Sequence, residues 1–176
     1  MRLRFFGIAL GLLFFVPAVA SADAHRWGAS GGGGGASGSQ MWGVHTTFDY
    51  TFYDVRKPDA RVKFFNLIYD FSVHSGTHED ADVTIKTGLT GLGVRWARNS
   101  ESRHVFGVQG MVGGVSSLPD CLAGSLGGLY EYVKHRSNNG MVVAVRGQYD
   151  YIGINGDTRG FHRYSGSLVF RFQTGH

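Results

Sequence analysis

Eight charged side chains at alternating positions of apolar segments have the greatest capacity for chemistry in this sequence. Four are acids and four are arginines: Asp49, Asp70, Glu131, Asp150, Arg95, Arg146, Arg163 and Arg171. Charges that leave water are stable only when they are paired and hydrogen-bonded. The equal numbers of the two signs therefore predict a buried ion cluster, if the fold brings these side chains to one face.

A second candidate chemistry is nucleophilic. His135 precedes Ser137 by two positions, and a histidine base beside a serine hydroxyl can activate that hydroxyl towards an ester. The alternative is a polar hairpin turn, because Asn139-Gly140 is a preferred hairpin pair.

Metal chemistry has weaker support. His74, His78 and Glu79 could bind a metal in a loop, but their spacing is loose, and a solvated loop is the better interpretation. Cys121 is the only cysteine, which excludes an internal disulfide, and we interpret it as a small apolar residue at a strand start. We expect no catalytic site, no cofactor and no metal site.

The elements that must position the charges are strands. Side chains of a strand alternate between its two faces, and seven segments show this two-residue period. Each is long for a soluble strand and long enough to cross a membrane when tilted. The segments are residues 42–54, 61–73, 84–97, 103–115, 121–134, 141–152 and 162–173.

The last segment shows the division of faces most clearly. Tyr164, Leu168, Phe170 and Phe172 share one face, and the arginines at its two ends lie on the other. A soluble sandwich would turn the apolar face inward, whereas a membrane barrel turns it towards lipid and keeps the charges in its lumen. Aromatic residues near the strand ends, typical of a membrane-interface girdle, favour the barrel.

Residues 25–40 are rich in Gly and Ser and permit two interpretations. They form a flexible linker, or they form a degenerate first strand. Connections at 55–60, 98–102 and 135–140 are short, and we expect longer loops at 74–83 and 153–161, with 116–120 as a short exception. If short turns face the periplasm, an eighth strand must precede Met41, and bacterial barrels usually have an even strand number.

The N-terminal residues 1–24 have the pattern of a secretory signal peptide. Arg2 and Arg4 precede an apolar stretch, and small-residue sites permit cleavage after Ala20, Ala22 or Ala24. The formal net charge of the whole chain is +4. Lys and Arg are not clustered, so we expect no nucleic-acid partner. Export and strand length together predict a transmembrane β-barrel over residues 41–176, located in the cell outer membrane of a Gram-negative bacterium.

Two stretches resemble a known family. Residues 143–151 (Val-Ala-Val-Arg-Gly-Gln-Tyr-Asp-Tyr) and 163–172 (Arg-Tyr-Ser-Gly-Ser-Leu-Val-Phe-Arg-Phe) resemble small bacterial outer-membrane proteins of the OmpA-like barrel superfamily, as does Asp70-Phe71-Ser72. The resemblance covers about residues 41–173. It implies an all-β, antiparallel, up-and-down barrel of eight strands without enzymatic activity in most members.

The resemblance also assigns a role to the last strand. It implies that Tyr164, Gly166, Leu168, Phe170 and Phe172 are read by the outer-membrane assembly machinery. This chain departs from many members, which end on the aromatic residue, because residues 173–176 follow it here.

The function expected from these observations is structural. We expect a monomer in contact with outer-membrane lipids that serves envelope integrity or surface interaction, with a porin-like pore as a minor possibility. One alternative is an enzyme, because His135 and Ser137 resemble the His-x-Ser-Asn stretch of outer-membrane lipid A deacylases. Another is a soluble periplasmic β-sandwich binder.

Overall fold

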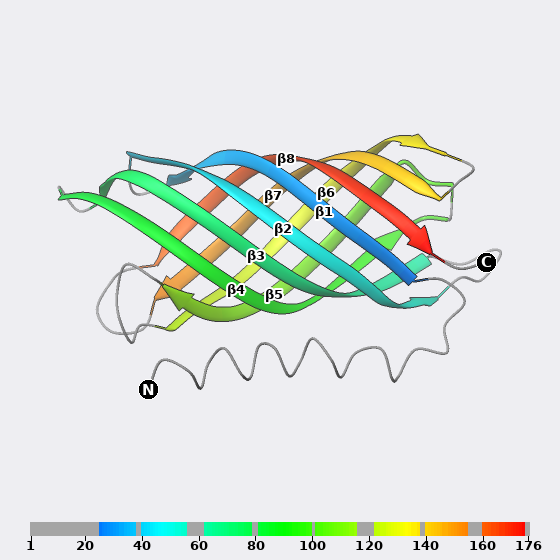
Figure 1. Ribbon diagram of the computed structural model, residues 1–176, viewed down its shortest axis with the longest axis horizontal. Helices are drawn as coiled ribbons and strands as arrows, with labels where there is room; N and C mark the ends of the chain where they lie inside the picture. Colours follow the sequence, from blue (N-terminus) through cyan, green and yellow to red (C-terminus); the bar gives the residue numbers. More distant parts are fainter. Residues whose placement is uncertain are drawn as a thin grey trace.

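The computed structural model describes residues 25–37, 40–55, 62–78, 81–99, 101–115, 122–137, 140–154 and 160–174. Each strand pairs antiparallel with the next along the chain, and the first pairs with the last, so the sheet closes on itself (Figure 1). The strands are β1 (His25–Ser37), β2 (Gln40–Val55), β3 (Val62–His78), β4 (Ala81–Ala97), β5 (His104–Val115), β6 (Leu122–Arg136), β7 (Met141–Ile154) and β8 (Phe161–Thr174). The predicted eight-stranded, up-and-down barrel is confirmed.

The barrel has two distinct ends. The start of β1 and the end of β8 lie at one of them (Figure 1), which we call the terminal end. The opposite end, which we call the distal end, has a protruding hairpin. Pairing of β3 with β4 continues as far as His78 opposite Ala81, whereas pairing of β4 with β5 begins only at Thr87 opposite Val115.

The glycine-rich segment forms β1, so the linker interpretation is wrong for His25–Ser37. Glycine loses more conformational entropy than any other residue when it is ordered in a strand. β1 nevertheless pairs with β2 on one side and with β8 on the other along most of its length. A ladder needs only backbone N–H and C=O groups, and two neighbouring strands supply partners for both.

The prediction of a long loop at 74–83 is also wrong. β3 continues to His78 and β4 begins at Ala81, so residues 79–80 alone separate these strands. His74 therefore belongs to a strand and points into the barrel, where its side chain is 1% exposed. The sequence predicted a long connection here, and that prediction was part of the argument for an eighth strand. The connection between β3 and β4 is instead short.

The interior has three layers. Polar and charged side chains fill the middle. An apolar cluster that includes Met41, Leu89, Met111 and Phe161 packs above them towards the distal end. A smaller cluster of Ala97, Val105, Val133, Ala144 and Val169 packs towards the terminal end. The sequence did not predict these two apolar layers. Few polar residues mark the inward positions of β4 and β5, so the inward and outward faces of these strands are hard to distinguish from the sequence.

The outer face is apolar with aromatic groups towards both ends. Near the terminal end, Nδ1 of His104 lies 2.8 Å from the hydroxyl of Tyr130. Near the distal end, the hydroxyl of Tyr149 lies 2.6 Å from Nδ1 of His162. Tyr and His combine an apolar body with a polar tip, which suits the boundary between an apolar layer and water. Within the described residues, no helix is long and apolar enough to cross a membrane.

Candidate functional site

The interior holds two groups of ion pairs, and the larger lies towards the terminal end. We call it the terminal cluster, and it consists of Asp49, Glu131, Arg95, Arg146 and Arg171. The shortest links run from Arg95 to Asp49 at 2.6 Å and from Arg171 to Glu131 at 2.6 Å. Arg146 joins both acids, with Nη2 3.0 Å from Asp49 and Nε 2.8 Å from Glu131.

The smaller group, which we call the distal cluster, is built around one guanidinium. Nη1 of Arg163 lies 2.7 Å from Oδ1 of Asp70, and its Nη2 lies 2.8 Å from Oδ2 of Asp150. Side-chain amides complete the shell, since Gln148 donates to Asp150 at 2.7 Å and Gln109 donates to the same carboxylate at 3.2 Å. Arg163, Asp70 and Asp150 are all 0% exposed.

The eight residues predicted to form a lumen ion cluster therefore lie together inside the barrel. They come from β2, β3, β4, β6, β7 and β8. The structure adds a feature that the count of charges could not show. The terminal cluster contains three arginines and two acids, whereas the distal cluster contains two acids and one arginine, so the balance of the whole interior hides an uneven distribution along its axis.

Two inward-facing glycines make room for the carboxylates. Gly28 of β1 is the register partner of Asp49, and Gly127 of β6 is the register partner of Asp150. A Cβ at Gly28 would collide with Oδ1 of Asp49, and a Cβ at Gly127 would collide with Oδ1 of Asp150. Gly28 thus has a packing role in β1, although glycine weakens the strand propensity of that segment.

Sequence reasoning missed several polar residues of the interior. Ser30 of β1 accepts a bond from Nη1 of Arg146 at 3.3 Å, and Thr47 donates to Asp70 at 3.3 Å. His45 and His74 are also buried there. Thr47 and His45 lie on the same inward face of β2 as Asp49, so the two-residue period of the strand could have predicted them. Ser30 could not, because its strand was not recognised.

The residues assigned to the assembly strand lie on the outer face of β8. Tyr164, Leu168, Phe170 and Phe172 are 51%, 53%, 43% and 52% exposed, and Gly166 is exposed among them. Arg163, which precedes Tyr164, points inward. The alternation of polarity along β8 thus corresponds to the inside and the outside of the barrel.

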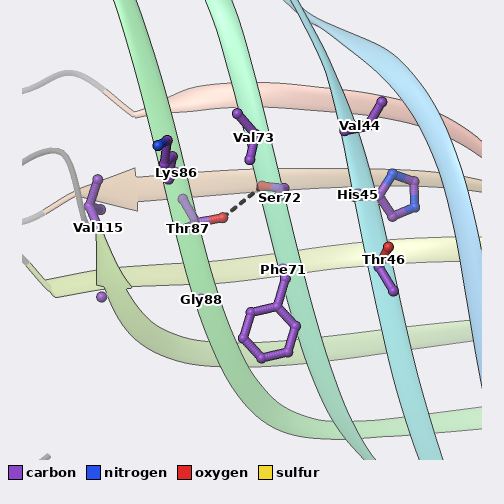
Figure 2. A pocket seen from close by; sticks show the side chains of 11 residues that line it. Val44, His45, Thr46, Phe71, Ser72, Val73, Lys86, Thr87, Gly88 and Val115 are labelled. Carbon is purple, nitrogen blue, oxygen red and sulfur yellow. Dashed lines mark hydrogen bonds between the residues drawn. The ribbon is translucent and has the colours of Figure 1, made fainter.

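A groove of about 640 Å³ crosses the outer face near the distal end. Figure 2 shows Val44 on β2, Phe71 and Val73 on β3, and Lys86 on β4 among the residues that line it. Gly88 also lines the groove, and a Cβ added to it would lie 3.7 Å from the ring of Phe71. An extended apolar group can lie in this groove with Lys86 beside it.

The candidate nucleophile lies at the terminal end. β6 ends at Arg136, so Ser137 belongs to the following turn, where its N–H donates to the carbonyl of Met141 at 2.8 Å. A register shift between Val133 and His135 pairs His135 with Val143, which faces outward. Ser137 instead lines a cavity at the mouth of the barrel. The two side chains do not share the strand face that the base-and-hydroxyl hypothesis requires.

Metal ligation finds no geometric support among the described residues, where no group of three His, Cys, Asp or Glu side chains is placed to hold an ion. The side chain of His78, the whole of Glu79 and Cys121 lie outside the described part. No protein-family model matches this chain, and no curated protein sequence matches it significantly.

Proposed function

We propose that this chain is an integral outer-membrane β-barrel protein with a structural or surface-interaction role. The observation that carries the proposal is the inverted polarity of the closed sheet. Arg146, Arg163 and Glu131 are fully buried inside, while Leu126, Leu168 and Phe170 face outward. A closed barrel of this kind meets lipid with its apolar face and satisfies every backbone group internally.

The extent of the outer apolar surface supports a membrane over water as its surroundings. Large apolar side chains are exposed on every strand, including Trp27 on β1, Trp42 on β2 and Val112 on β5. Soluble monomers rarely expose contiguous apolar patches larger than a few hundred Å². A soluble binder would also place apolar side chains around a ligand cavity, whereas the middle layer of this interior is filled by ions.

The protruding β3–β4 hairpin supports a surface role for the distal end. Beyond Val73 and Lys86 its outer face becomes polar: Ser75 and Thr84 are hydrogen-bonded at 2.9 Å, and Thr77 donates to Asp82 at 3.1 Å. A change from apolar to polar on the outer face of a barrel strand is expected where the strand leaves the lipid. The hairpin would then stand above the membrane and be available to other molecules.

The remaining parts of the proposal follow from this location. The protein works as a monomer, its outer face contacts outer-membrane lipids, and β8 is the strand that the assembly machinery recognises. The groove beside Lys86 would hold an acyl chain. We assign no catalytic role to His135 and Ser137, and we propose that residues 1–24 are the export signal.

Fractionation and gel migration test the location. We expect the protein to be extracted from cells only by detergent and to migrate faster on a denaturing gel before heating than after it, because a folded barrel binds less detergent. Release by osmotic shock, with no change in migration on heating, would identify a soluble periplasmic protein instead.

Cysteine labelling in intact cells tests the orientation. His78→Cys and Ser137→Cys, each in a Cys121→Ser background, place one thiol at each end of the barrel. A membrane-impermeant maleimide should label only the first variant if the distal end faces outward, and both after the cells are lysed. Labelling of the second variant alone in intact cells would reverse the orientation.

Substitution on the outer face tests the contact with lipid. Leu168→Arg places a charge near the middle of β8, where an arginine facing lipid costs about 2–4 kcal/mol. We expect little folded protein in the outer-membrane fraction. Thr84→Arg is the matched control, because Thr84 faces outward on the polar part of β4 and should assemble normally. Equal assembly of the two variants would contradict the proposed membrane boundary.

A further inference from the structure

The groove on the outer face near the distal end contains two outward-facing glycines on neighbouring strands. Gly88 of β4 is the register partner of Gly114 of β5 on one side and of Phe71 of β3 on the other. All three residues line the groove, and the ring of Phe71 is exposed. The glycines have no side chain to project from the outer face, so they leave an apolar space beside this ring. A hydrocarbon chain can lie there in contact with Phe71.

A positive charge stands beside the apolar part of the groove. Towards the distal end, the next outward-facing pair after Phe71 and Gly88 is Val73 of β3 with Lys86 of β4. Both residues line the groove, and the side chain of Lys86 is exposed. Figure 2 shows Lys86 and Val73 on adjacent strands at this edge. Among the described residues, Lys86 has no carboxylate partner, so its charge is available to a bound molecule.

Hydroxyl groups follow the lysine along the same hairpin. Ser75 and Thr84 are the next outward-facing pair and are hydrogen-bonded at 2.9 Å. One hydroxyl donates within this pair, so the hydrogen of the other is available to an outside acceptor. Asp82, further along β4, accepts from Thr77 at 3.1 Å and would repel an anion there. An anionic group is therefore favoured at the level of Lys86.

We propose that this groove binds lipid A, with one acyl chain in its apolar part and a phosphate group at Lys86. The inference rests on the proposed function with the distal end facing outward, because lipid A is the phosphorylated and acylated glycolipid of the outer leaflet. A lysine ammonium binds phosphate as a point charge. Its long stem can lie along apolar surface while the charge stays at the polar boundary. The free hydroxyl hydrogen of the Ser75–Thr84 pair would be donated to a neighbouring phosphate or sugar oxygen.

Titration of the folded full-length mature protein in nonionic maltoside micelles tests the site. Lipid A is added as an increasing mole fraction of the micelle, and amide chemical shifts are followed by NMR. We expect saturable changes at Gly88 and Gly114 and none at Tyr132, which lies on the outer face near the terminal end.

Two further lipids separate the parts of the ligand. Lipid A without its phosphates should bind about three- to tenfold more weakly, the usual effect of one lysine near a charged lipid surface. Phosphatidylglycerol has a single phosphodiester charge and should also bind more weakly than lipid A. Equal affinity for phosphatidylglycerol would mean that the groove accepts any anionic lipid, and would overturn the assignment to lipid A.

A substitution inside the groove tests the acyl-chain part. Gly88→Leu fills the space beside Phe71 and should weaken lipid A binding by about tenfold. The variant should fold, because a Cβ at Gly88 meets the ring of Phe71 at an ordinary contact distance of 3.7 Å. Gly147→Leu is the matched control: it places the same side chain on the outer face of β7, outside the groove, where a Cβ meets no atom within 4 Å. It should change the affinity less than about twofold.

A substitution of the lysine tests the headgroup part. Lys86→Gln should weaken binding of lipid A by about three- to tenfold and should remove the preference for phosphorylated over dephosphorylated lipid A. Lys134→Gln removes the same charge from an exposed residue of β6 at the terminal end and should leave that preference intact. Heat-modifiable migration verifies that all four variants are folded.

The inference would be overturned if lipid A gave no saturable shifts at the groove, or if Lys86→Gln kept the full preference for phosphate. Neither result would affect the proposed function, because fractionation and gel migration test the location without reference to the groove. Release of the protein by osmotic shock would instead overturn the proposed function, and the inference with it.

Discussion

Arg163 shows at the scale of single residues how the interior is stabilised and where it is vulnerable. Its guanidinium is hydrogen-bonded to both Asp70 and Asp150, and all three groups are shielded from water. Removal of Arg163 would leave Asp70 and Asp150 as two buried carboxylates without their cation, whereas removal of Asp70 leaves Arg163 paired with Asp150. The stability of the distal cluster should therefore be strongly non-additive.

A double-mutant cycle measures this coupling. Arg163→Gln should lower the free energy of unfolding by about 3–5 kcal/mol. Asp70→Asn should lower it by less, because Arg163 remains paired with Asp150, and the double variant should lose clearly less than the sum. Urea unfolding in lipid vesicles, followed by tryptophan fluorescence, provides the measurement. Asp82→Asn, which changes an exposed acid of the outer hairpin, should cost no more than about 0.5 kcal/mol. Additive effects would indicate that the ion pair does not form.

The terminal cluster differs from the distal one because its arginines outnumber its acids. The carboxylate of Glu131 accepts hydrogen bonds from Nε of Arg146 at 2.8 Å and from Nη2 of Arg171 at 2.6 Å. Loss of this carboxylate would leave several guanidiniums close together with one acid, Asp49, between them.

At the scale of elements, β1 is the strand that depends most on its neighbours. Its side chains contribute little, since glycine occupies a run of its central positions, and its pairing with β2 and β8 is made by the backbone. Its inward and outward glycines are not equivalent. Gly28 faces Asp49, while a Cβ at Gly31 would meet no atom within 4 Å.

Alanine substitutions along β1 should therefore have opposite signs. Gly28→Ala forces a methyl group against Asp49 and should lower the free energy of unfolding by about 1–3 kcal/mol. Gly31→Ala has open space and restricts the unfolded chain, so it should raise that free energy by about 0.4–1 kcal/mol. The same urea unfolding measurement applies to both. Equal effects of the two substitutions would contradict the orientation of β1.

At the scale of the whole molecule, closure of the sheet determines what the interior can conduct. Eight strands enclose a space that side chains fill. Here an apolar layer covers the ion clusters towards the distal end, whereas a cavity at the terminal end reaches Arg95 and Arg171 of the terminal cluster. The interior is therefore a packed core with a charged middle, and any passage through it would require both the ion pairs and the distal apolar layer to rearrange.

Permeability measurements examine this consequence. Liposomes that contain the folded protein should swell in arabinose no faster than protein-free liposomes, because ion-paired side chains and an apolar layer fill the interior. A sixteen-stranded porin, whose barrel leaves an aqueous channel, serves as the positive control. Swelling comparable to that of the porin would show that the interior opens widely in the membrane.

Much of this molecule follows from local pattern. The two-residue period of a strand separates Arg163 and Arg171 from Leu168 and Phe170 without any knowledge of neighbouring strands. Seven strands, the faces of most of them and an expected total of eight were accessible in this way, whereas the faces of the glycine-rich strand at 103–115 were ambiguous. The end of β3 could not be predicted in this way, because the polar residues of the hairpin that it forms with β4 resemble those of a loop.

The tertiary structure alone decided three things. It made a strand of the glycine run, because backbone pairing from two neighbours replaces the missing side-chain propensity. It divided the charges into an arginine-rich and an acid-rich cluster, because only the register of a closed sheet brings Asp49 across the barrel to Arg146. It also gathered four arginines around the cavity at the terminal end: Arg26, Arg95, Arg136 and Arg171. These residues are far apart in sequence and share only the end of the barrel at which their strands begin or finish.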